Sequence, residues 1–196
     1  MSLPFTTRLV HLNELDRALD LCLEAFADEV VTRWATPHHA NRREQFEESL
    51  EAAVNAQEMM VAVSSEGQFA AASFWHHLDT EQIKAMKAES TISASMPTDP
   101  AGRITTATAL TAARHPAAPH IFLSSMATLP EHRGQGAGSV MLDSGISYAV
   151  SRALPIYLEA STPQSRTLYL RKGFIDHGQP IAPPQHGPVL QPMIRS

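Results

Sequence analysis

The chain has 196 residues, and its 15 Lys and Arg against 20 Asp and Glu give a formal net charge of −5 with neutral histidines. This length suggests one domain that buries its core without disulfides or structural metals. A single cysteine excludes an intrachain disulfide and a cysteine-rich zinc site. The sequence pI near 6.0, with no long basic run, argues against an electrostatic nucleic-acid binder. No apolar run approaches ~18 residues and the N-terminus lacks a signal-peptide pattern, so we expect a cytoplasmic protein without a membrane span.

The first segment predicts a short strand over residues 8–11, followed by an amphipathic helix. Apolar residues recur at helical spacing along one stripe, namely Leu15, Ala18, Leu19, Cys22 and Phe26. Asn13 is the expected N-cap of this helix, with Asp16 three residues later as a shortened capping box. Because Cys22 lies on the buried stripe, we expect it to pack in the core rather than act as a nucleophile.

A second helix, a loop and a hairpin are predicted next. The second helix is expected to begin at Asn41, and residues 25–39 before it read as a loop. Two strand-like runs, Met59–Ser64 and Phe69–Trp75, are separated by a short turn that contains Gly67. This arrangement predicts an antiparallel hairpin.

Residues 79–119 carry the weakest pattern of the chain. A helix is predicted over residues 81–89, then a break rich in proline, then a second helical run over residues 104–114. We interpret the whole segment as an insertion or lid.

The C-terminal half predicts a strand over residues 120–129, a glycine-rich turn, a long helix, a strand and a short helix. The long helix is expected to end at Pro155, and its apolar face is formed by Leu142, Ile146, Ala149, Val150 and Ala153. A final strand around residues 189–194 is expected at a sheet edge, because Pro192 cannot donate a hydrogen bond to a neighbouring strand.

The glycine-rich turn between the strand and the long helix predicts a site for a polyanion. Backbone N–H groups at a helix N-terminus point outward, and the helix dipole adds about half a positive charge there. Gly134, Gly136 and Gly138 lack side chains that would keep a diphosphate away, and Arg133 adds a positive charge.

Two common phosphate-binding loops fit this turn poorly. A Walker A loop requires Gly-Lys-Ser or Gly-Lys-Thr, which does not occur in the sequence. A dinucleotide fingerprint beginning at Gly134 or Gly136 requires a further glycine, where the chain has Ser139 or Met141. The strand–turn–helix–strand order, with Glu159 near the end of the second strand, still keeps the nicotinamide cofactor as a less favoured alternative.

Two motifs in this region resemble a known family. The pattern R-G-Q-G-A-G (Arg133–Gly138), preceded by a strand that ends M-A-T-L-P, resembles the R/Q-x-x-G-x-G/A motif of the GNAT N-acetyltransferases. The pattern L-Y-L-R-K-G-F (Leu168–Phe174) looks like the family's Y-x-x-x-G-F helix, and the two occur in the right order. The resemblance covers residues 120–175 firmly and the N-terminal layout loosely. It implies one α/β (α+β) domain over residues 1–196, with a mixed, mostly antiparallel central sheet flanked by helices on both faces.

The resemblance also implies acetyl-CoA as co-substrate and a binding site for it. In the family, the glycines bind the pyrophosphate, and backbone groups of the preceding strand contact the pantetheine arm and the thioester carbonyl. Carried onto this chain, the implied binding residues are Met126, Ala127, Thr128, Arg133, Gly134, Gln135, Gly136, Ala137, Gly138 and Ser139.

Two residues are implied as catalytic. Tyr169 occupies the position of the general acid that meets the departing thiolate; its alternative role is to pack beside Phe174. Glu159 occupies a strand that faces the same cleft in the family, as a base or a substrate-orienting carboxylate. Its alternative role is to pair with Arg166 or Lys172 at the surface.

The segment around Glu159 most resembles the puromycin N-acetyltransferase branch, as does the early segment Ala25–Arg33. Many family members carry an asparagine seven residues before the tyrosine to hold the pantetheine arm, and this chain has Thr162 there. Candidate acceptor-site residues are Asp28, Arg33, Trp34 and His76. No metal site is expected, because the neighbours His76 and His77 point to opposite faces of a strand.

These observations predict an enzyme that transfers the acetyl group of acetyl-CoA to a primary amine of a small molecule, by direct attack in a ternary complex. A protein or peptide acceptor, or a module that senses CoA without turnover, are the alternatives. We expect no nucleic-acid or membrane partner and a possible homodimer.

Overall fold

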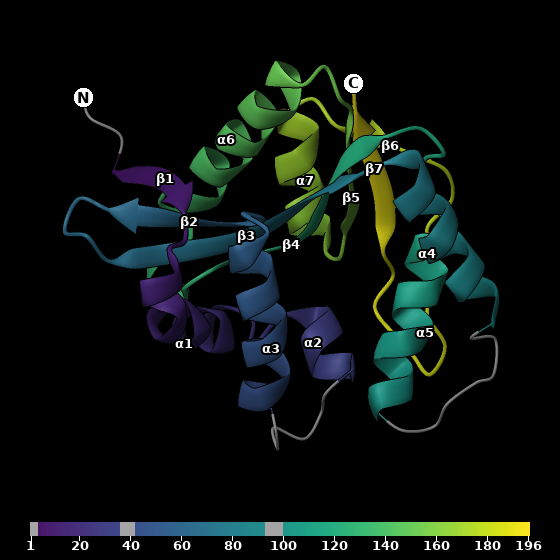
Figure 1. Cartoon of the computed structure of the whole chain (residues 1–196), viewed down its shortest axis with the longest axis horizontal. Helices are drawn as coiled ribbons and strands as arrows, with labels where there is room; N and C mark the ends of the chain where they lie inside the picture. The colour runs from purple at the N-terminus through teal and green to yellow at the C-terminus, as the bar shows by residue number, and fades with distance from the viewer. Residues whose placement is uncertain (1–3, 36–41, 93–99) are drawn as a thin grey trace. The chain divides into compact units, whose positions relative to one another are not determined.

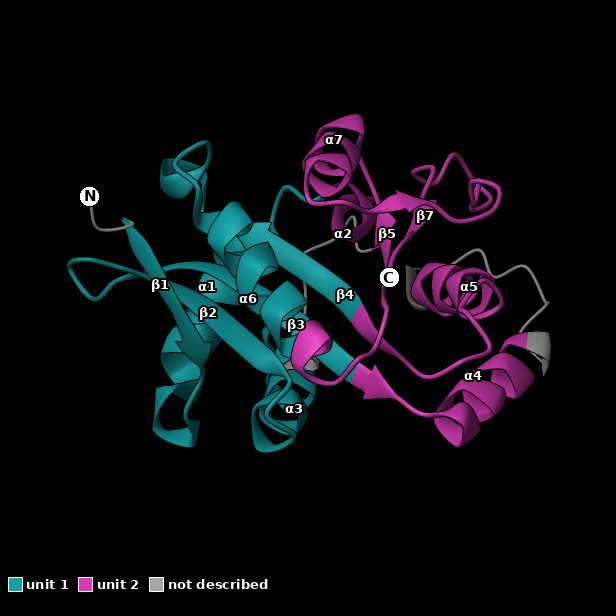
Figure 2. Cartoon of the chain, turned by 90° about the horizontal axis from the view of Figure 1, so that it is seen from above, with its two compact units in different colours: residues 1–29, 39–76, 123–148 teal, residues 30–38, 77–122, 149–196 magenta. Residues whose placement is uncertain are grey.

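The structure is a computed structural model that describes residues 4–35, 42–92 and 100–196. The chain divides into two compact units, shown in different colours in Figure 2. Unit 1 comprises residues 1–29, 39–76 and 123–148, and unit 2 comprises residues 30–38, 77–122 and 149–196. The prediction of one domain with an insertion over residues 79–119 stays a prediction.

The described residues form both helices and strands, which Figure 1 labels in chain order. The strands are β1 (Phe5–Leu9), β2 (Met59–Ser64), β3 (Phe69–Leu78), β4 (His120–Thr128), β5 (Ile156–Ala160), β6 (Ile175–Asp176) and β7 (Gln191–Arg195). The helices are α1 (Leu15–Ala25), α2 (Val30–Ala35), α3 (Arg42–Asn55), α4 (Thr80–Ile92), α5 (Pro100–Ala112), α6 (Ala137–Ser151) and α7 (Pro163–Arg171). Two short 3₁₀ helices, η1 (Leu12–Glu14) and η2 (Pro130–His132), complete the set.

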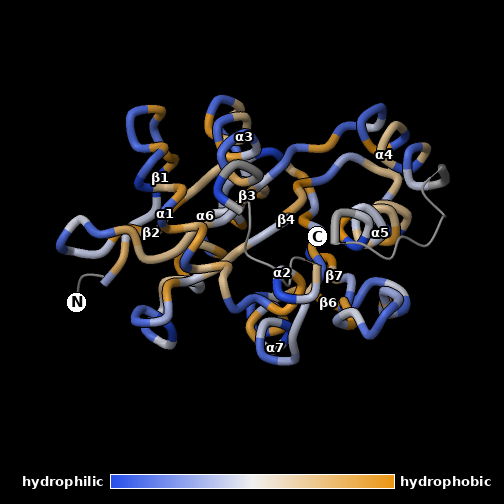
Figure 3. The backbone as a smooth tube through the Cα atoms, turned by 90° about the horizontal axis from the view of Figure 1, so that it is seen from below, coloured by the Kyte–Doolittle hydropathy of each residue, from blue (hydrophilic) through white to orange (hydrophobic). Residues whose placement is uncertain are grey.

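Within the described part of the chain, seven strands follow the order β1-β2-β3-β4-β5-β7-β6. The pairs β1–β2 and β2–β3 in unit 1, and β5–β7 and β6–β7 in unit 2, are all antiparallel. The predicted α/β class with a mostly antiparallel sheet is therefore confirmed, as is the hairpin of β2 and β3. The turn of this hairpin is hydrophilic, as its blue colour in Figure 3 shows.

Helices cover both faces of the sheet in unit 1. Alternate residues of a strand point to opposite faces, and the neighbours Val61 and Ala62 in β2 belong to two different apolar clusters. The cluster around Val61 is filled by α1 and α3, including Leu19 and the predicted core residue Cys22. The cluster around Ala62 is filled from α6, where Met141 is fully buried.

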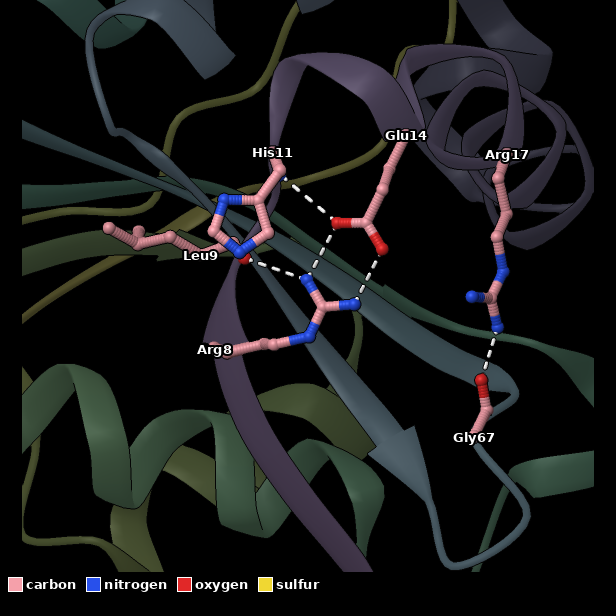
Figure 4. A network of polar contacts seen from close by, with 6 residues as sticks. All are labelled: Arg8, Leu9, His11, Glu14, Arg17 and Gly67. Atoms are coloured by element: carbon pink, nitrogen blue, oxygen red, sulfur yellow. Dashed lines mark hydrogen bonds and ion pairs between the residues drawn. The ribbon is translucent and has the colours of Figure 1, made fainter.

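The start of the chain differs from the prediction by a few residues. The strand is Phe5–Leu9, and η1 precedes α1, so Asn13 lies inside the 3₁₀ helix and is not an N-cap. Figure 4 shows what fixes this junction: the Arg8 guanidinium donates to both carboxylate oxygens of Glu14, at 2.7 and 2.6 Å, and the His11 backbone N–H donates to Glu14 at 3.1 Å. The predicted start of α3 at Asn41 lies outside the described residues.

Helix α6 ends earlier than its apolar pattern suggests. It stops at Ser151, and Ala153 beyond it has a left-handed φ of 52°, so Pro155 is not what ends the helix. Val150 is 63% exposed, so it does not belong to the buried face, although Leu142 and Ala149 do. The prediction extended the stripe by one turn too many.

Inside α6, Gly145 allows an aromatic ring to approach the helix backbone. A Cβ at this position would overlap the Trp75 ring of β3. The ring is buried, and its Nε1 donates to the Ser73 hydroxyl at 2.8 Å. Glycine is therefore required here for space rather than for backbone conformation.

In unit 2, two expectations about the C-terminal region change. The final strand, β7, is not at a sheet edge, because it pairs with β5 on one side and with the two-residue strand β6 on the other. Pro192 in β7 lies opposite Glu159, and its carbonyl accepts from the His177 N–H at 2.8 Å. The segment over residues 79–119 contains α4 and α5, near the two predicted helices. Helix α4 extends beyond residues 81–89 at both ends, whereas α5 starts before residue 104 and ends before residue 114.

No helix among the described residues is both long and apolar enough to cross a membrane.

Candidate functional site

The glycine-rich turn in unit 1 has the conformation that its glycines predict. Gly134 and Gly136 have φ values of 73° and 99°, a region that residues with a Cβ rarely adopt. A Cβ placed on either glycine would meet no atom within 4 Å. The turn therefore combines a backbone conformation that only glycine adopts easily with open space beside the two glycines.

Helix α6 begins directly after this turn. The Val140 N–H donates to the Gly136 carbonyl at 3.0 Å, which places Gly136 at the N-cap position. The N–H groups of Ala137, Gly138 and Ser139 precede this bond and have no carbonyl to bind within the helix. Together with the positive end of the helix dipole, these amides suit an anion.

Arg133, at the start of the turn, is held by side-chain and backbone contacts. Its Nη1 and Nη2 donate to the two carboxylate oxygens of Asp28 at 2.6 and 2.8 Å, and its Nε donates to the Thr128 carbonyl at 3.0 Å. Asp28 raises the pKa of the Arg133 guanidinium above its usual value. The structure therefore joins a predicted acceptor-site residue, Asp28, to a predicted phosphate-binding residue.

The last residues of β4 lie in the same unit. Met126 packs against the cluster filled by α6, and Ala127 packs against the cluster filled by α1 and α3. Gln135 donates to the Glu131 carbonyl within the turn. The assignment of these residues, and of Thr128 and the turn itself, to acetyl-CoA binding stays a prediction.

A hydrogen-bonded chain of three polar side chains also lies in unit 1. His76, in β3, has Nδ1 2.8 Å from the Glu58 carboxylate and Nε2 2.9 Å from the Ser124 hydroxyl in β4. The side chains of His76 and Glu58 are each 29% exposed, and Ser124 is exposed. The sequence singled out His76 but not Glu58 or Ser124, because three residues from separate segments carry no local pattern.

The two predicted catalytic residues belong to unit 2. Tyr169, in α7, is only 7% exposed and its ring centre lies 5.8 Å from that of Phe174. The packing that was its alternative role is therefore present, and this packing also orients the ring. Thr162, which this chain has in place of the family's asparagine, directly precedes the helix. Its hydroxyl accepts from the Ser165 N–H at 3.0 Å, so Thr162 serves as the N-cap.

Glu159, in β5, is buried rather than paired at the surface. Its side chain is 8% exposed, and Arg166 pairs instead with Asp176, at 3.0 and 2.6 Å. The alternative role in which Glu159 pairs with Arg166 is therefore wrong. Burial raises the pKa of Glu159 to about 7, an effect that the nearby Tyr157 hydroxyl partly offsets.

Two buried histidines adjoin Glu159. His120 Nδ1 lies 2.9 Å from the Ala118 carbonyl, which only accepts, so this nitrogen carries the proton. His120 Nε2 then accepts from His115 Nδ1 at 2.9 Å, because burial lowers the pKa of both rings, that of His115 to about 3, and keeps them neutral. His115 Nε2 is left as an acceptor 3.9 Å from Glu159 Oε1.

His115 Nε2 and an ionised Glu159 carboxylate are both acceptors, so their proximity favours the protonated form of Glu159. Glu159 Oε1 and the Tyr157 hydroxyl are buried and have no hydrogen-bond partner within the described part of the chain. The neutral carboxyl can donate toward His115 Nε2, whereas the carboxylate cannot. This arrangement and the burial of Glu159 therefore act in the same direction on its pKa.

The two other predicted acceptor-site residues lie on α2, where the sequence predicted only a loop. Trp34 is anchored in unit 2: its Nε1 donates to the Gln185 carbonyl at 3.2 Å, and its own carbonyl accepts from Arg103 at 2.9 Å. Arg33 is exposed on the same helix. Trp34 thus packs against the C-terminal loop, while Asp28 belongs to unit 1.

No group of three or more His, Cys, Asp or Glu side chains within residues 4–35, 42–92 and 100–196 could hold a metal ion. Cys22 is fully buried, and burial raises the pKa of its thiol to about 12, so the reactive thiolate is disfavoured.

Comparisons with known proteins agree with the motifs and the fold. The family model described as "Acetyltransferase (GNAT) family" matches residues 34–174. A solved Corynebacterium glutamicum structure, described as histone acetyltransferase HPA2 and related acetyltransferase, is 24% identical, with a TM-score of 0.69 over 97% of this chain and 95% of that one. An agmatine N-acetyltransferase mutant is 16% identical, with a TM-score of 0.78 over 98% of this chain and 99% of that one.

A third similar structure was solved with coenzyme A bound. It is the PaiA N-acetyltransferase of Thermoplasma acidophilum in complex with coenzyme A, 9% identical, with a TM-score of 0.59 over 100% of this chain and 99% of that one. The chain belongs to the GNAT acetyltransferase family and is an N-acetyltransferase that takes its acetyl group from acetyl-CoA.

Proposed function

We propose that the enzyme transfers the acetyl group to a primary amine of a small molecule, by direct attack of the amine on the bound thioester. The observation that carries this proposal is the turn at Gly134 and Gly136, which leaves open space in front of the first amides of α6. A donor fixed by its diphosphate presents its thioester in a defined position. Holding two reactants at near-attack distance contributes roughly 7–11 kcal/mol in the best cases.

Glu159 is the proposed base, which takes a proton from the ammonium group of the acceptor so that the neutral amine can attack. An amine attacks only when it is unprotonated, and a general base works best when its pKa lies near the working pH. The pKa of about 7 that burial gives Glu159 meets this condition. His115 and His120 orient the carboxyl and remain neutral themselves, because burial lowers the pKa of each ring.

Tyr169 is the proposed hydrogen-bond donor to the leaving sulfur. A phenol has a reference pKa of about 10 and a thiol about 8.5, so complete proton transfer to the thiolate is uphill by about 2 kcal/mol. A hydrogen bond to the developing thiolate still lowers the barrier. Packing against Phe174, with the ring centres 5.8 Å apart, restricts the orientations of the Tyr169 ring.

Similar structures favour a small amine as acceptor. One is an agmatine N-acetyltransferase, and another is a Drosophila melanogaster enzyme that catalyses the formation of N-acetylagmatine. The net charge of −5 suits a cationic acceptor. A protein acceptor is the second candidate, because the Corynebacterium structure is described as a histone acetyltransferase and related acetyltransferase.

An acceptor screen tests the proposal. The purified protein is incubated with acetyl-CoA and a panel of polyamines, arylalkylamines, amino acids and lysine peptides, and the acetylated product is measured by mass spectrometry. We expect a small amine to be acetylated, and Tyr169→Phe to lower kcat about tenfold or more with little change in the KM for acetyl-CoA. Tight binding of acetyl-CoA without acetylation of any amine would instead indicate a CoA-sensing module, and acetylation of lysine peptides alone would indicate a protein acceptor.

A further inference from the structure

In unit 1, hydrogen bonds link Glu58 to His76 and His76 to Ser124, which is the order carboxylate, base and hydroxyl of a nucleophilic triad. The Glu58 carboxylate only accepts, so the proton of the neutral His76 ring is on Nδ1, which donates to it at 2.8 Å. His76 Nε2 then carries the lone pair and accepts from the Ser124 hydroxyl at 2.9 Å. Both distances lie within the range over which a carboxylate orients a base and the base activates a hydroxyl.

Ser124 lies close to the part of β4 to which the family resemblance assigns the thioester of acetyl-CoA. The side chain belongs to an exposed residue of β4, two residues before Met126 and therefore about 7 Å along the strand. By resemblance to the family, residues 126–128 are the part of the strand that contacts the thioester arm of acetyl-CoA. All of these residues, and the glycine-rich turn, belong to unit 1.

The backbone around the triad fixes its carboxylate and its base. Glu58 directly precedes β2, and its carbonyl accepts from the Trp75 N–H in β3 at 2.8 Å. Because Trp75 is the residue before His76, this bond holds the carboxylate and the imidazole on adjoining strands. The Trp75 ring is itself buried and bonded to Ser73 at 2.8 Å, which restrains this end of β3.

We propose that Ser124 is a nucleophile that accepts an acetyl group from activated esters, acetyl-CoA included, and passes it to water. In the first step Ser124 Oγ forms a bond to the acetyl carbon, His76 Nε2 takes the hydroxyl proton, the carbon–sulfur bond breaks, and the thiolate leaves with that proton as free CoA. In the second step His76 takes a proton from water and the hydroxide attacks the acetyl carbon. The bond from that carbon to Ser124 Oγ then breaks, and acetic acid leaves as His76 returns the proton to Ser124. The sum is hydrolysis of the ester, with no oxidant or metal.

This activity goes beyond amine acetylation, because it needs no amine. It uses Ser124, His76 and Glu58 of unit 1, whereas the proposed acid and base of amine transfer, Tyr169 and Glu159, belong to unit 2. The two activities can therefore be separated by assay and by substitution.

The first experiment uses p-nitrophenyl acetate, which contains neither amine nor coenzyme. We expect the protein to release nitrophenol, with an initial burst if deacylation is slow, and Ser124→Ala to lower the acylation rate about 100-fold, the lower end of the range for a positioned base and nucleophile. His76→Gln should give a loss of similar size and Glu58→Gln a smaller one. The matched control is Ser147→Ala, an exposed serine of α6 whose hydroxyl donates to the Asp143 carbonyl at 2.9 Å.

The second experiment looks for the covalent intermediate. After acid quenching, peptide mapping by mass spectrometry should find one acetyl group on Ser124 with either p-nitrophenyl acetate or acetyl-CoA, and none at that position in His76→Gln. Equal rates in Ser124→Ala and Ser147→Ala, or an acetyl group on another residue alone, would overturn the proposal. The ester assay stands whatever the amine screen gives, so failure of the proposed function and failure of this inference are distinguishable.

Discussion

At the scale of single residues, Gly145 is the position where one methyl group should matter most. Gly145→Ala would place a Cβ within the Trp75 ring, which cannot move easily because it is buried and bonded to Ser73. Overpacking a core of this kind costs about 1–3 kcal/mol of unfolding free energy. Urea denaturation should show that loss, with Ser147→Ala on the same helix as the control.

The Gly145 prediction has an internal rescue. The double variant Gly145→Ala/Trp75→Leu should lose less unfolding free energy than the sum of the losses in the two single variants. The smaller leucine side chain leaves room for the added methyl group. Strict additivity of the two changes would mean that the ring does not constrain this glycine.

The raised pKa of Glu159 predicts how the free energy of unfolding depends on pH. Its pKa is raised by burial from an ordinary 4.5 to about 7, so the folded state binds more protons than the unfolded state between these values. The contribution of Glu159 to stability is therefore full below pH 4.5 and lost as the pH rises toward and past 7. Glu159→Gln, which cannot ionise, should be more stable than the parent above pH 7, by on the order of 3 kcal/mol, and similar to it near pH 4.5.

The measurement is the unfolding free energy in urea at several pH values, compared as a difference between the two proteins. His115 acts in the opposite direction, because its pKa is lowered to about 3, so its own contribution is lost as the pH falls from 6.5 to 3. This effect is common to both proteins and cancels in the difference. The exposed Glu48→Gln is the control, and a difference that does not change with pH would contradict the raised pKa.

At the scale of elements, the start of α7 depends on Thr162. Its hydroxyl accepts from the Ser165 N–H and thereby caps the helix that carries Tyr169. Thr162→Ala should cost about 1 kcal/mol and Thr162→Ser much less, because serine retains the capping hydroxyl. Hydrogen exchange should show faster opening of the first turn of α7 in the alanine variant, and equal exchange in both variants would contradict the role of the cap.

Elements were predictable from the sequence where a pattern is long and local. The hairpin of β2 and β3 and the buried stripe of α1 follow from periodicity over six or more residues. Helix α2 has six residues, too few to show a stripe, and the sequence predicted a loop there. The place of β7 between two strands could not be foreseen, because β6 is only two residues long and Pro192 suggested an edge.

The functional residues divide in the same way. The glycines at 134 and 136 were predictable, because their positive φ values and the helix that follows belong to one short segment. The bond between Asp28 and Arg133 joins residues 105 positions apart and left no signal in the sequence. The partners of His76 were missed for the same reason.

At the scale of the whole molecule, binding of acetyl-CoA should raise the melting temperature. A ligand at 100 times its Kd adds about 2.7 kcal/mol of stability, which for a chain of this size corresponds to about 5–10 °C. Gly136→Glu should abolish this shift, because it places a carboxylate where the diphosphate is proposed to bind. Calorimetry with a non-hydrolysable acetyl-CoA analogue should show the same loss.

Gly67→Glu is the matched control for this test. Gly67 lies in the hairpin turn, has a similar φ of 79°, and a Cβ there would also meet nothing within 4 Å. Both variants therefore add the same charge at a glycine with a positive φ, and only the variant at 136 should lose the shift. Loss of the shift in both would mean that general instability, rather than a blocked site, explains the result.

The bidentate pairing of Arg133 with Asp28 has a consequence for how this enzyme can change over evolutionary time. Because Asp28 neutralises the charge of the Arg133 guanidinium, the turn attracts an anion chiefly through its backbone N–H groups. Every amino acid except proline supplies such a group. Replacement of an exposed side chain such as Gln135 should then be well tolerated. Proline at 138 or 139, which deletes an amide hydrogen while leaving charge untouched, should be among the least tolerated changes in the loop.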